Sequence, residues 1–298
     1  MKKSINLLSW FYYSLSCYFY ALVFLLFLLP AQSLLHSAFD DTGLNARPQG
    51  LGGAFTGISD DLNSVYYNPA GIGKINKHQV MFSYRDFYSL NLLTQNYVAF
   101  SVPGNVLNTA ISIHRIGTTN NVEFDYTEDT YIVTLAGRVA YPKNLFCGVN
   151  FKFYRLFSES NASGWGLDTG LLYELFDKKL NLGLMLQNLN NSKIVWDTGV
   201  TDKLDINFRP GMSYSPIENL KIAFDYEKLK KLNSGIELLT LKKTIGLRAG
   251  INNLSSKKNI VAYGLSLNFN NLQFDWAFSE HCMLGYTHFF TLSIRAGK

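Results

Sequence analysis

The chain has 298 residues, of which 47% are hydrophobic and 16% charged, and its formal net charge is +5. This length suits one mid-sized barrel or one large core, and the hydrophobic content excludes a disordered chain, which needs low hydrophobicity and high net charge. The sequence contains no basic run with interleaved aromatic residues of the kind that follows a phosphate backbone, so nucleic acid is not an expected partner.

The N-terminus has the features of an export signal. Its parts are a positive n-region (Lys2, Lys3), an apolar h-region (18–29) and a small-residue cleavage region (31–33). These features predict a signal peptide over residues 1–33, with a second cleavage position after Ala38. An uncleaved anchor is the alternative, because apolar residues run almost without interruption from Leu7 to Leu29. We expect cleavage and therefore export of the mature chain.

The next segment, residues 39–76, has neither strand nor helix periodicity and is rich in turn residues. Gly52, Gly53 and Gly57 permit close backbone packing or a positive φ. Ser59 or Asp60 can cap a short helix that runs toward residue 66.

The same segment contains three further candidate features. Asn68-Pro69 predicts a helix stop or turn before Gly71. Gly50-Leu51-Gly52 raises the alternative of a phosphate-binding loop, but Phe55 stands where the dinucleotide fingerprint requires glycine, and no strand pattern precedes it. The pair Asp60-Asp61 raises the alternative of a calcium loop, whose spacing it does not match, so we expect turns and caps instead.

From residue 78 onward apolar residues recur at every second position, which is the pattern of β-strands. In residues 271–279, for example, one predicted face is Leu272, Phe274, Trp276 and Phe278, and the other is Gln273, Asp275 and Ala277. Pro210 interrupts one such run and predicts a bulge or bend there.

Turn residues divide this region into about fourteen strands of roughly 8–13 residues, a length that suits tilted membrane strands. The predicted strands begin near His78, Thr94, Val106, Asp129, Leu145, Ser163, Leu180, Asp205, Asn219, Ser234, Lys243, Lys258, Asn271 and Tyr286.

Two all-β folds compete for this pattern. A soluble sandwich turns its apolar face inward, whereas a transmembrane barrel turns that face toward lipid and its small or polar face toward the lumen. The polar face is low in charge and aromatic residues gather at strand ends, both of which favour the barrel. The candidate lumen-facing charges are Arg138, Lys152, Asp168, Glu174, Asp225, Arg248, Asp275 and Arg295. We therefore predict an all-β, transmembrane antiparallel β-barrel over residues 77–298, in a bacterial outer membrane.

The segment before the barrel resembles the start of FadL-like outer-membrane proteins, and within them the PorV/PorQ-type branch. The resemblance rests on three stretches, which are Gly52-Gly53-Ala54-Phe55, Asp60-Asp61 and Tyr66-Tyr67-Asn68-Pro69-Ala70-Gly71. The end of the chain is similar as well, in Gly235-Ile236-Glu237, in Leu247-Arg248-Ala249-Gly250 and in the closing strand from His288 to Ala296.

The resemblance implies that residues 39–76 fold into the lumen as a plug that gates a passive route for hydrophobic small molecules. The gating motif would be Gly52, Gly53, Gly57, Asp60, Asp61, Asn68, Pro69 and Gly71. In the PorV-like branch the barrel instead serves type IX secretion and binds secretion-system or cargo proteins. Transport of a hydrophobic ligand is the leading expectation, and the secretion role is the alternative.

No catalytic or metal-binding arrangement is evident in the sequence. The five histidines lack metal-ligand spacing, the three cysteines are irregularly spaced, and no nucleophile motif accompanies them. We therefore expect no enzyme activity, no metal and no cofactor. Outer-membrane lipid is an expected partner.

Overall fold

The computed structural model describes residues 38–39, 42–227, 231–253, 260–281 and 284–296. The predicted signal peptide, residues 1–33, lies outside the described residues. No helix within these described ranges is long and apolar enough to cross a membrane.

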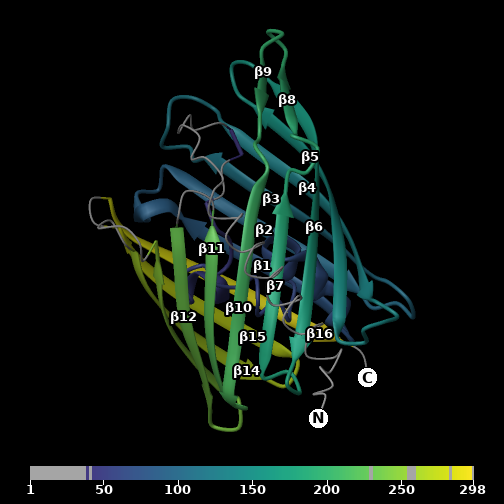
Figure 1. Ribbon diagram of the computed structural model, residues 1–298. Coiled ribbons are helices and arrows are strands. Elements are labelled where there is room, and N and C mark those ends of the chain that lie inside the picture. The colour runs from purple at the N-terminus through teal and green to yellow at the C-terminus, as the bar shows by residue number, and fades with distance from the viewer. Residues whose placement is uncertain (1–37, 40–41, 228–230, 254–259, 282–283, 297–298) are drawn as a thin grey trace, which may run out of the picture. The chain divides into compact units, whose positions relative to one another are not determined.

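Fourteen antiparallel strands form a closed barrel, because β1 pairs with β16 and β5 pairs with β6 (Figure 1). The prediction of a fourteen-stranded all-β barrel is therefore confirmed. The barrel strands are β1 (His78–Asp86), β2 (Leu93–Val102), β3 (Asn108–Thr118), β4 (Thr127–Arg138), β5 (Leu145–Phe157), β6 (Ala162–Leu175), β7 (Leu180–Gln187), β10 (Asn207–Ile217), β11 (Leu220–Glu227), β12 (Lys231–Thr240), β13 (Ile245–Asn252), β14 (Ile260–Phe269), β15 (Leu272–His281) and β16 (Gly285–Ala296).

The wall of the barrel is apolar outside and polar inside, as a membrane-spanning barrel requires. In β15, for example, Leu272 and Phe274 are 46% and 40% exposed on the outer face, whereas Gln273 and Asp275 are buried on the inner face. The alternation that was read from the sequence is thus confirmed, and its apolar face points outward. The soluble sandwich is excluded by this arrangement.

The two ends of the barrel differ. One end, called here the short-turn end, carries turns such as residues 218–219 and 270–271. The other, called here the hairpin end, carries an extra hairpin of β8 (Lys193–Trp196) and β9 (Thr201–Lys203) between β7 and β10. This hairpin pairs with the upper part of β6 and extends the wall at the top of Figure 1. A short 3-10 helix, η2 (Phe87–Ser89), follows β1 at the same end.

The irregularity predicted at Pro210 lies elsewhere. Pro210 pairs in register with Leu184 of β7, and the register shift between β10 and β11 falls between Tyr214 and Ile217. Proline lacks a backbone N–H, which is tolerated at Pro210 because the β10–β11 pairing begins only at Gly211.

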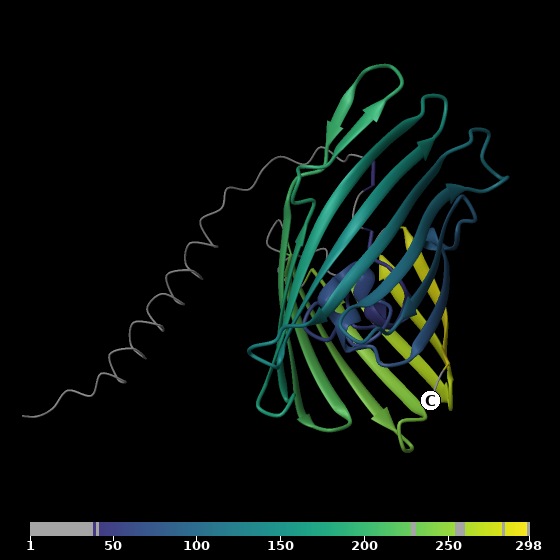
Figure 2. The same ribbon diagram turned by 90° about the vertical axis from the view of Figure 1, so that its right-hand side faces the viewer.

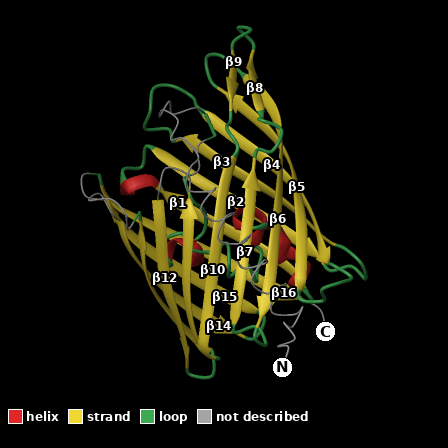
Figure 3. Ribbon diagram, in the orientation of Figure 1, coloured by secondary structure: helices red, strands yellow, loops and turns green. Residues whose placement is uncertain are grey.

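Residues 42–76, called here the lumenal segment, pack inside the ring of strands (Figures 2 and 3). The segment contains α2 (Ala46–Gly50), α3 (Ser64–Tyr67) and η1 (Pro69–Lys74). Its apolar residues, Leu51, Phe55, Ile58 and Leu62 among them, form a core with Met81, Tyr97 and Ala99 of the wall. The domain boundary after residue 76 stays a prediction.

The predicted helix cap at Ser59 or Asp60 is wrong. The N-cap position of α3 is Asn63, with no side-chain cap, and its backbone N–H donates to Asp61 Oδ1 at 2.9 Å. Asp61 thus forms a local turn, and Asp60 is directed to an ion pair instead. The predicted helix stop is confirmed, since α3 ends at Tyr67 and Asn68 begins η1 by accepting the Ala70 N–H at 3.2 Å.

Candidate functional site

Arg47, in α2 of the lumenal segment, is the centre of a buried ion-pair cluster. Its Nε and Nη2 atoms donate to the two carboxylate oxygens of Glu237 in β12, each at 2.9 Å. Its Nη1 atom lies 2.5 Å from Asp60 Oδ1 and 2.6 Å from Asp61 Oδ2. One guanidinium therefore holds the two ends of the segment's Gly-rich stretch together and joins both to the wall.

The cluster continues along the inner wall. Arg248 in β13 lies 2.7 Å from Glu237 and 2.9 Å from Asp275 in β15, and Lys221 in β11 lies 2.5 Å from Asp60. Gln273 donates to Asp275 at 2.8 Å and accepts from Arg295. Opposite charges alternate through this series, so each buried carboxylate faces a cation, as burial of charge requires.

The charge state of the cluster is fixed by its own members. Burial by itself lowers the pKa of Arg47, but the adjacent carboxylates of Asp60, Glu237 and Asp61 outweigh burial and hold that pKa well above its usual range. Burial by itself raises the pKa of Asp60. The positive charges of Arg47 and Lys221 have the larger, opposite effect, so the pKa of Asp60 lies well below its usual value. Both side chains are charged at neutral pH.

We expect the lumenal segment to stay bound inside the barrel as pH falls from 7 to about 4, which is the unperturbed pKa of an aspartate side chain. A depressed folded-state pKa stabilises the native state above the unfolded pKa, and this contribution is lost only as pH falls through the lower folded value. Ion conductance of the barrel in a planar bilayer should therefore stay at its neutral-pH level until pH 4. Opening between pH 6 and 5 would contradict this.

Asp225 of β11 anchors the middle of the lumenal segment. Its Oδ2 atom accepts the backbone N–H groups of Phe55 and Thr56 at 3.0 and 2.9 Å. On the neighbouring strand, Ser213 Oγ donates to the Gly57 carbonyl at 2.9 Å. The wall thus satisfies backbone groups of a stretch that has no regular structure of its own.

Glycine at the predicted gating positions has a direct steric reason. Gly52 and Gly53 have φ values of +65° and +85°, and a Cβ at Gly52 would lie 2.6 Å from the backbone of Ile251. A Cβ at Gly57 would lie 2.6 Å from the backbone of Met212. At Gly71, a Cβ would come closer than 3.0 Å to Ser59 within the segment itself. The segment therefore contacts the wall backbone directly.

Asn68 and Pro69 fix the segment to the opposite side of the barrel. Asn68 Nδ2 donates to the carbonyls of Leu171 in β6 and Thr56, at 2.9 and 3.0 Å. A Cβ at Gly148 of β5 would come closer than 3.0 Å to the Pro69 backbone, so glycine there makes room for η1. The gating role of these residues stays a prediction.

The remaining candidate charges are distributed over the inner wall. Lys152 lies 2.7 Å from Asp168, and Glu174 lies 2.8 Å from Lys74 of η1. Arg138 differs from these, because it is exposed at the end of β4 with its guanidinium 5.2 Å from the Phe146 ring centroid.

Sequence reasoning missed Arg47, Lys221 and Glu237, the residues that tie Asp60 and Asp61 to the wall. Lys221 shares the polar face of its strand with Ala223 and Asp225. Its inward position could therefore be predicted from the two-residue period. Arg47 had no such periodic context, and its partner Glu237 is 190 positions away in the chain.

Toward the hairpin end, apolar side chains on the lumen side of the wall pack together. They are Tyr154, Leu156, Ala162, Ile194 and Leu204, and we call this set the upper cluster. Phe39 packs against it, with its ring centroid 4.9 Å from that of Tyr154, and its backbone N–H donates to Glu128 at 3.2 Å.

No protein-family model matches the sequence, and no curated protein matches it significantly. Solved structures do match the fold. The toluene transporter TodX of P. putida superimposes with a TM-score of 0.64 at 11% identity, over 87% of this chain and 100% of that chain. The toluene transporter TbuX of Ralstonia pickettii gives 0.62 at 12% identity, over 87% and 100%. A FadL homologue of Pseudomonas aeruginosa gives 0.57 at 12%, over 84% and 97%.

At these identities the similarity concerns the fold alone. The PorV/PorQ branch and its secretion role stay predictions. The chain therefore shares its fold with these FadL-type outer-membrane barrels.

Proposed function

We propose that the protein is a passive outer-membrane channel for hydrophobic small molecules, in which a ligand is captured at the upper cluster. The observation that supports this is the position of that cluster, because Leu156 and Ile194 are fully buried on the lumen side of the wall near the hairpin end and Phe39 packs against the cluster. Apolar side chains with a few polar groups at their edge suit a hydrophobic ligand. The solved structures of similar fold include two toluene transporters.

The position of Phe39 supports the same function. Its aromatic ring packs against Tyr154 of the upper cluster, where a monoaromatic or acyl ligand would make the same contacts. Below it, the lumenal segment fills the barrel and is held by Arg47, Asp225 and Asn68. Transport would then require the segment to move, with Gly52, Gly53 and Gly57 as the flexible points.

The test compares two neighbouring residues of β8. Ile194→Asn places an amide in the upper cluster, whereas Val195→Asn changes a side chain that is 50% exposed on the opposite face. We expect Ile194→Asn to lower uptake of labelled toluene and oleate roughly tenfold, because burying an unpaired amide costs about 1–3 kcal/mol. Val195→Asn should transport normally. The assay uses a bacterial host that lacks its own fatty-acid transporter.

A second variant tests the contact of Phe39 with the upper cluster. Phe39→Ala removes the ring that packs against Tyr154, so binding of the hydrophobic ligand to the purified protein should become tighter. Migration on a denaturing gel before and after boiling checks that each variant still forms a barrel. Uptake equal to that of the empty host for the folded wild-type protein would refute the transport function.

A further inference from the structure

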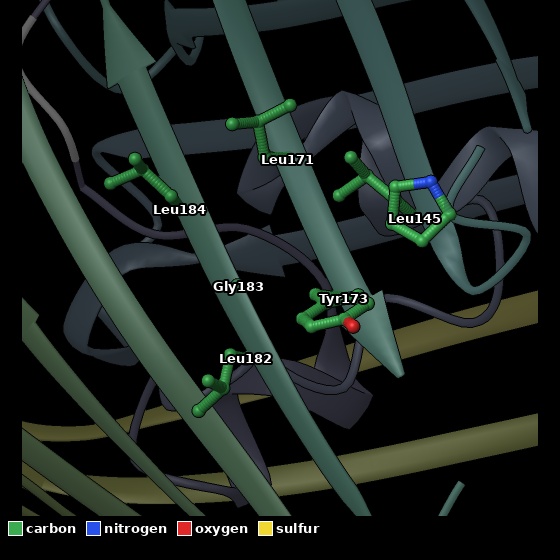
Figure 4. A pocket seen from close by; sticks show the side chains of 7 residues that line it. Leu145, Leu171, Tyr173, Leu182, Gly183 and Leu184 are labelled. Atoms are coloured by element: carbon green, nitrogen blue, oxygen red, sulfur yellow. The ribbon is translucent and has the colours of Figure 1, made fainter. Parts of the chain in front are cut away.

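The outer face of the wall carries a hollow of about 210 Å³ that the transport pathway does not use. It is lined by Pro142, Leu145, Leu171, Tyr173, Leu182, Gly183 and Leu184, from β5, β6, β7 and the turn before β5. Figure 4 shows the labelled side chains on three neighbouring strands. Leu171 and Leu182 are 42% and 39% exposed, so the hollow opens to the membrane side of the barrel.

The register of the strands forms this hollow. Tyr173 stands between Leu145 and Leu182 in one cross-strand row, and Leu171 stands beside Leu184 in the next. Between the rows lie Leu172 and Gly183, whose side-chain positions face the lumen, and the backbone of residue 56 in the lumenal segment fills the space behind Gly183. The result is an apolar furrow across β6 and β7.

Basic side chains lie beside the furrow at the short-turn end. Lys143 follows Pro142 in the turn between β4 and β5, and Lys178 and Lys179 are in the turn between β6 and β7. All three are exposed, and none forms an ion pair with another described residue. By contrast, Lys243 in the turn between β12 and β13 lies 2.6 Å from Glu218.

We propose that this furrow binds one acyl chain of an anionic glycerophospholipid, whose phosphate lies at Lys143, Lys178 and Lys179. Unpaired lysines complement the negative phosphate, and the Tyr173 ring suits the boundary between hydrocarbon and headgroup. In outer-membrane barrels the short turns face the periplasm, so the lipid belongs to the periplasmic leaflet. The inference depends on the membrane-spanning fold and is independent of transport.

The headgroup contribution is tested with a matched pair of turns. The turns 176–179 and 241–244 both contain two consecutive lysines, and each has three successive residues of positive φ, between +47° and +70°. Native mass spectrometry of the full-length barrel, titrated with phosphatidylglycerol or with phosphatidylcholine of the same acyl chains, counts bound lipids. We expect one preferred phosphatidylglycerol, weakened by Lys178→Gln/Lys179→Gln roughly fivefold for each lysine. Lys242→Gln/Lys243→Gln should have no effect.

The furrow itself is tested with outward leucines. Leu182→Ala/Leu184→Ala should weaken binding of both lipids, whereas Leu247→Ala, a change at a 47% exposed residue of β13, should weaken neither. Equal affinity for the two headgroups, or equal loss in both lysine pairs, would show a nonspecific annular lipid and overturn the proposal. Gel migration before and after boiling verifies that each variant is folded, and normal toluene uptake by the lysine variant would separate this site from the transport function.

Discussion

Arg47→Met should release the lumenal segment and open the barrel to ions. The substitution keeps most of the side-chain volume but removes the cation that three carboxylates share, Glu237, Asp60 and Asp61. Breaking a buried pair by removing one partner costs about 3–5 kcal/mol, because the remaining charge stays buried without compensation. We expect a large increase of single-channel conductance in planar bilayers and unfolding at a lower urea concentration.

Lys243 supplies the control. It lies 2.6 Å from Glu218, and the two side chains are 50% and 83% exposed. Surface pairs contribute only about 0–1 kcal/mol, so Lys243→Met should conduct and unfold like the wild type. The double variant Arg47→Met/Glu237→Met removes both charges and should recover part of the lost stability. Wild-type conductance in Arg47→Met would show that the cluster does not hold the segment.

Gly250→Ala should displace the lumenal segment by a steric clash, whereas Arg47→Met would release it by removing a charge. Gly250 of β13 and its register partner Gly235 of β12 both face Leu51, and an added Cβ at either one would come closer than 3.0 Å to backbone atoms of the segment. Because backbone cannot turn away as a side chain can, the segment must shift. Overpacking of this kind costs about 1–3 kcal/mol, and the double variant should cost more than either single one.

Gly246→Ala is the control for this experiment. It lies on the same face of β13, but its nearest neighbours are wall side chains, with Ser266 Cβ at 3.1 Å and Leu239 Cδ2 at 3.2 Å. It should leave conductance unchanged, while Gly250→Ala raises it. Proteolysis from the short-turn side gives a second measurement, since a displaced segment exposes its backbone. Equal protection of both variants would contradict direct contact between segment and wall.

The strands could be predicted because strand formation here is a local property. Alternation along residues 271–279 fixes which side chains share a face, and the barrel confirms that division residue by residue. Which face points outward followed from composition, since small and polar residues such as Gln273 and Asp275 do not suit lipid. The added hairpin of β8 and β9 was missed, because strands of four and three residues are too short to show a period.

In the lumenal segment, backbone conformation could be predicted from the sequence but the ion pairs could not. Its glycines and the stop at Asn68 were readable, because backbone conformation depends on the residue itself. The function of Asp60 was not, since a short-range rule assigned it to a helix cap while Arg47 and Lys221 bind it in the folded barrel. An ion pair depends on spatial proximity, which the closed wall creates between residues up to 190 positions apart.

The sequence by itself thus indicated the all-β class, about fourteen strands and the inward position of residues such as Asp225 and Asp275, because the two-residue period acts within each strand and turn residues separate the strands. Only the tertiary structure decided the partners of the lumenal charges, the contact of Phe39 with the upper cluster and the furrow across β6 and β7. Each of these depends on which strands become neighbours when the barrel closes and on what fills its lumen, and neither is encoded in any single stretch of the chain.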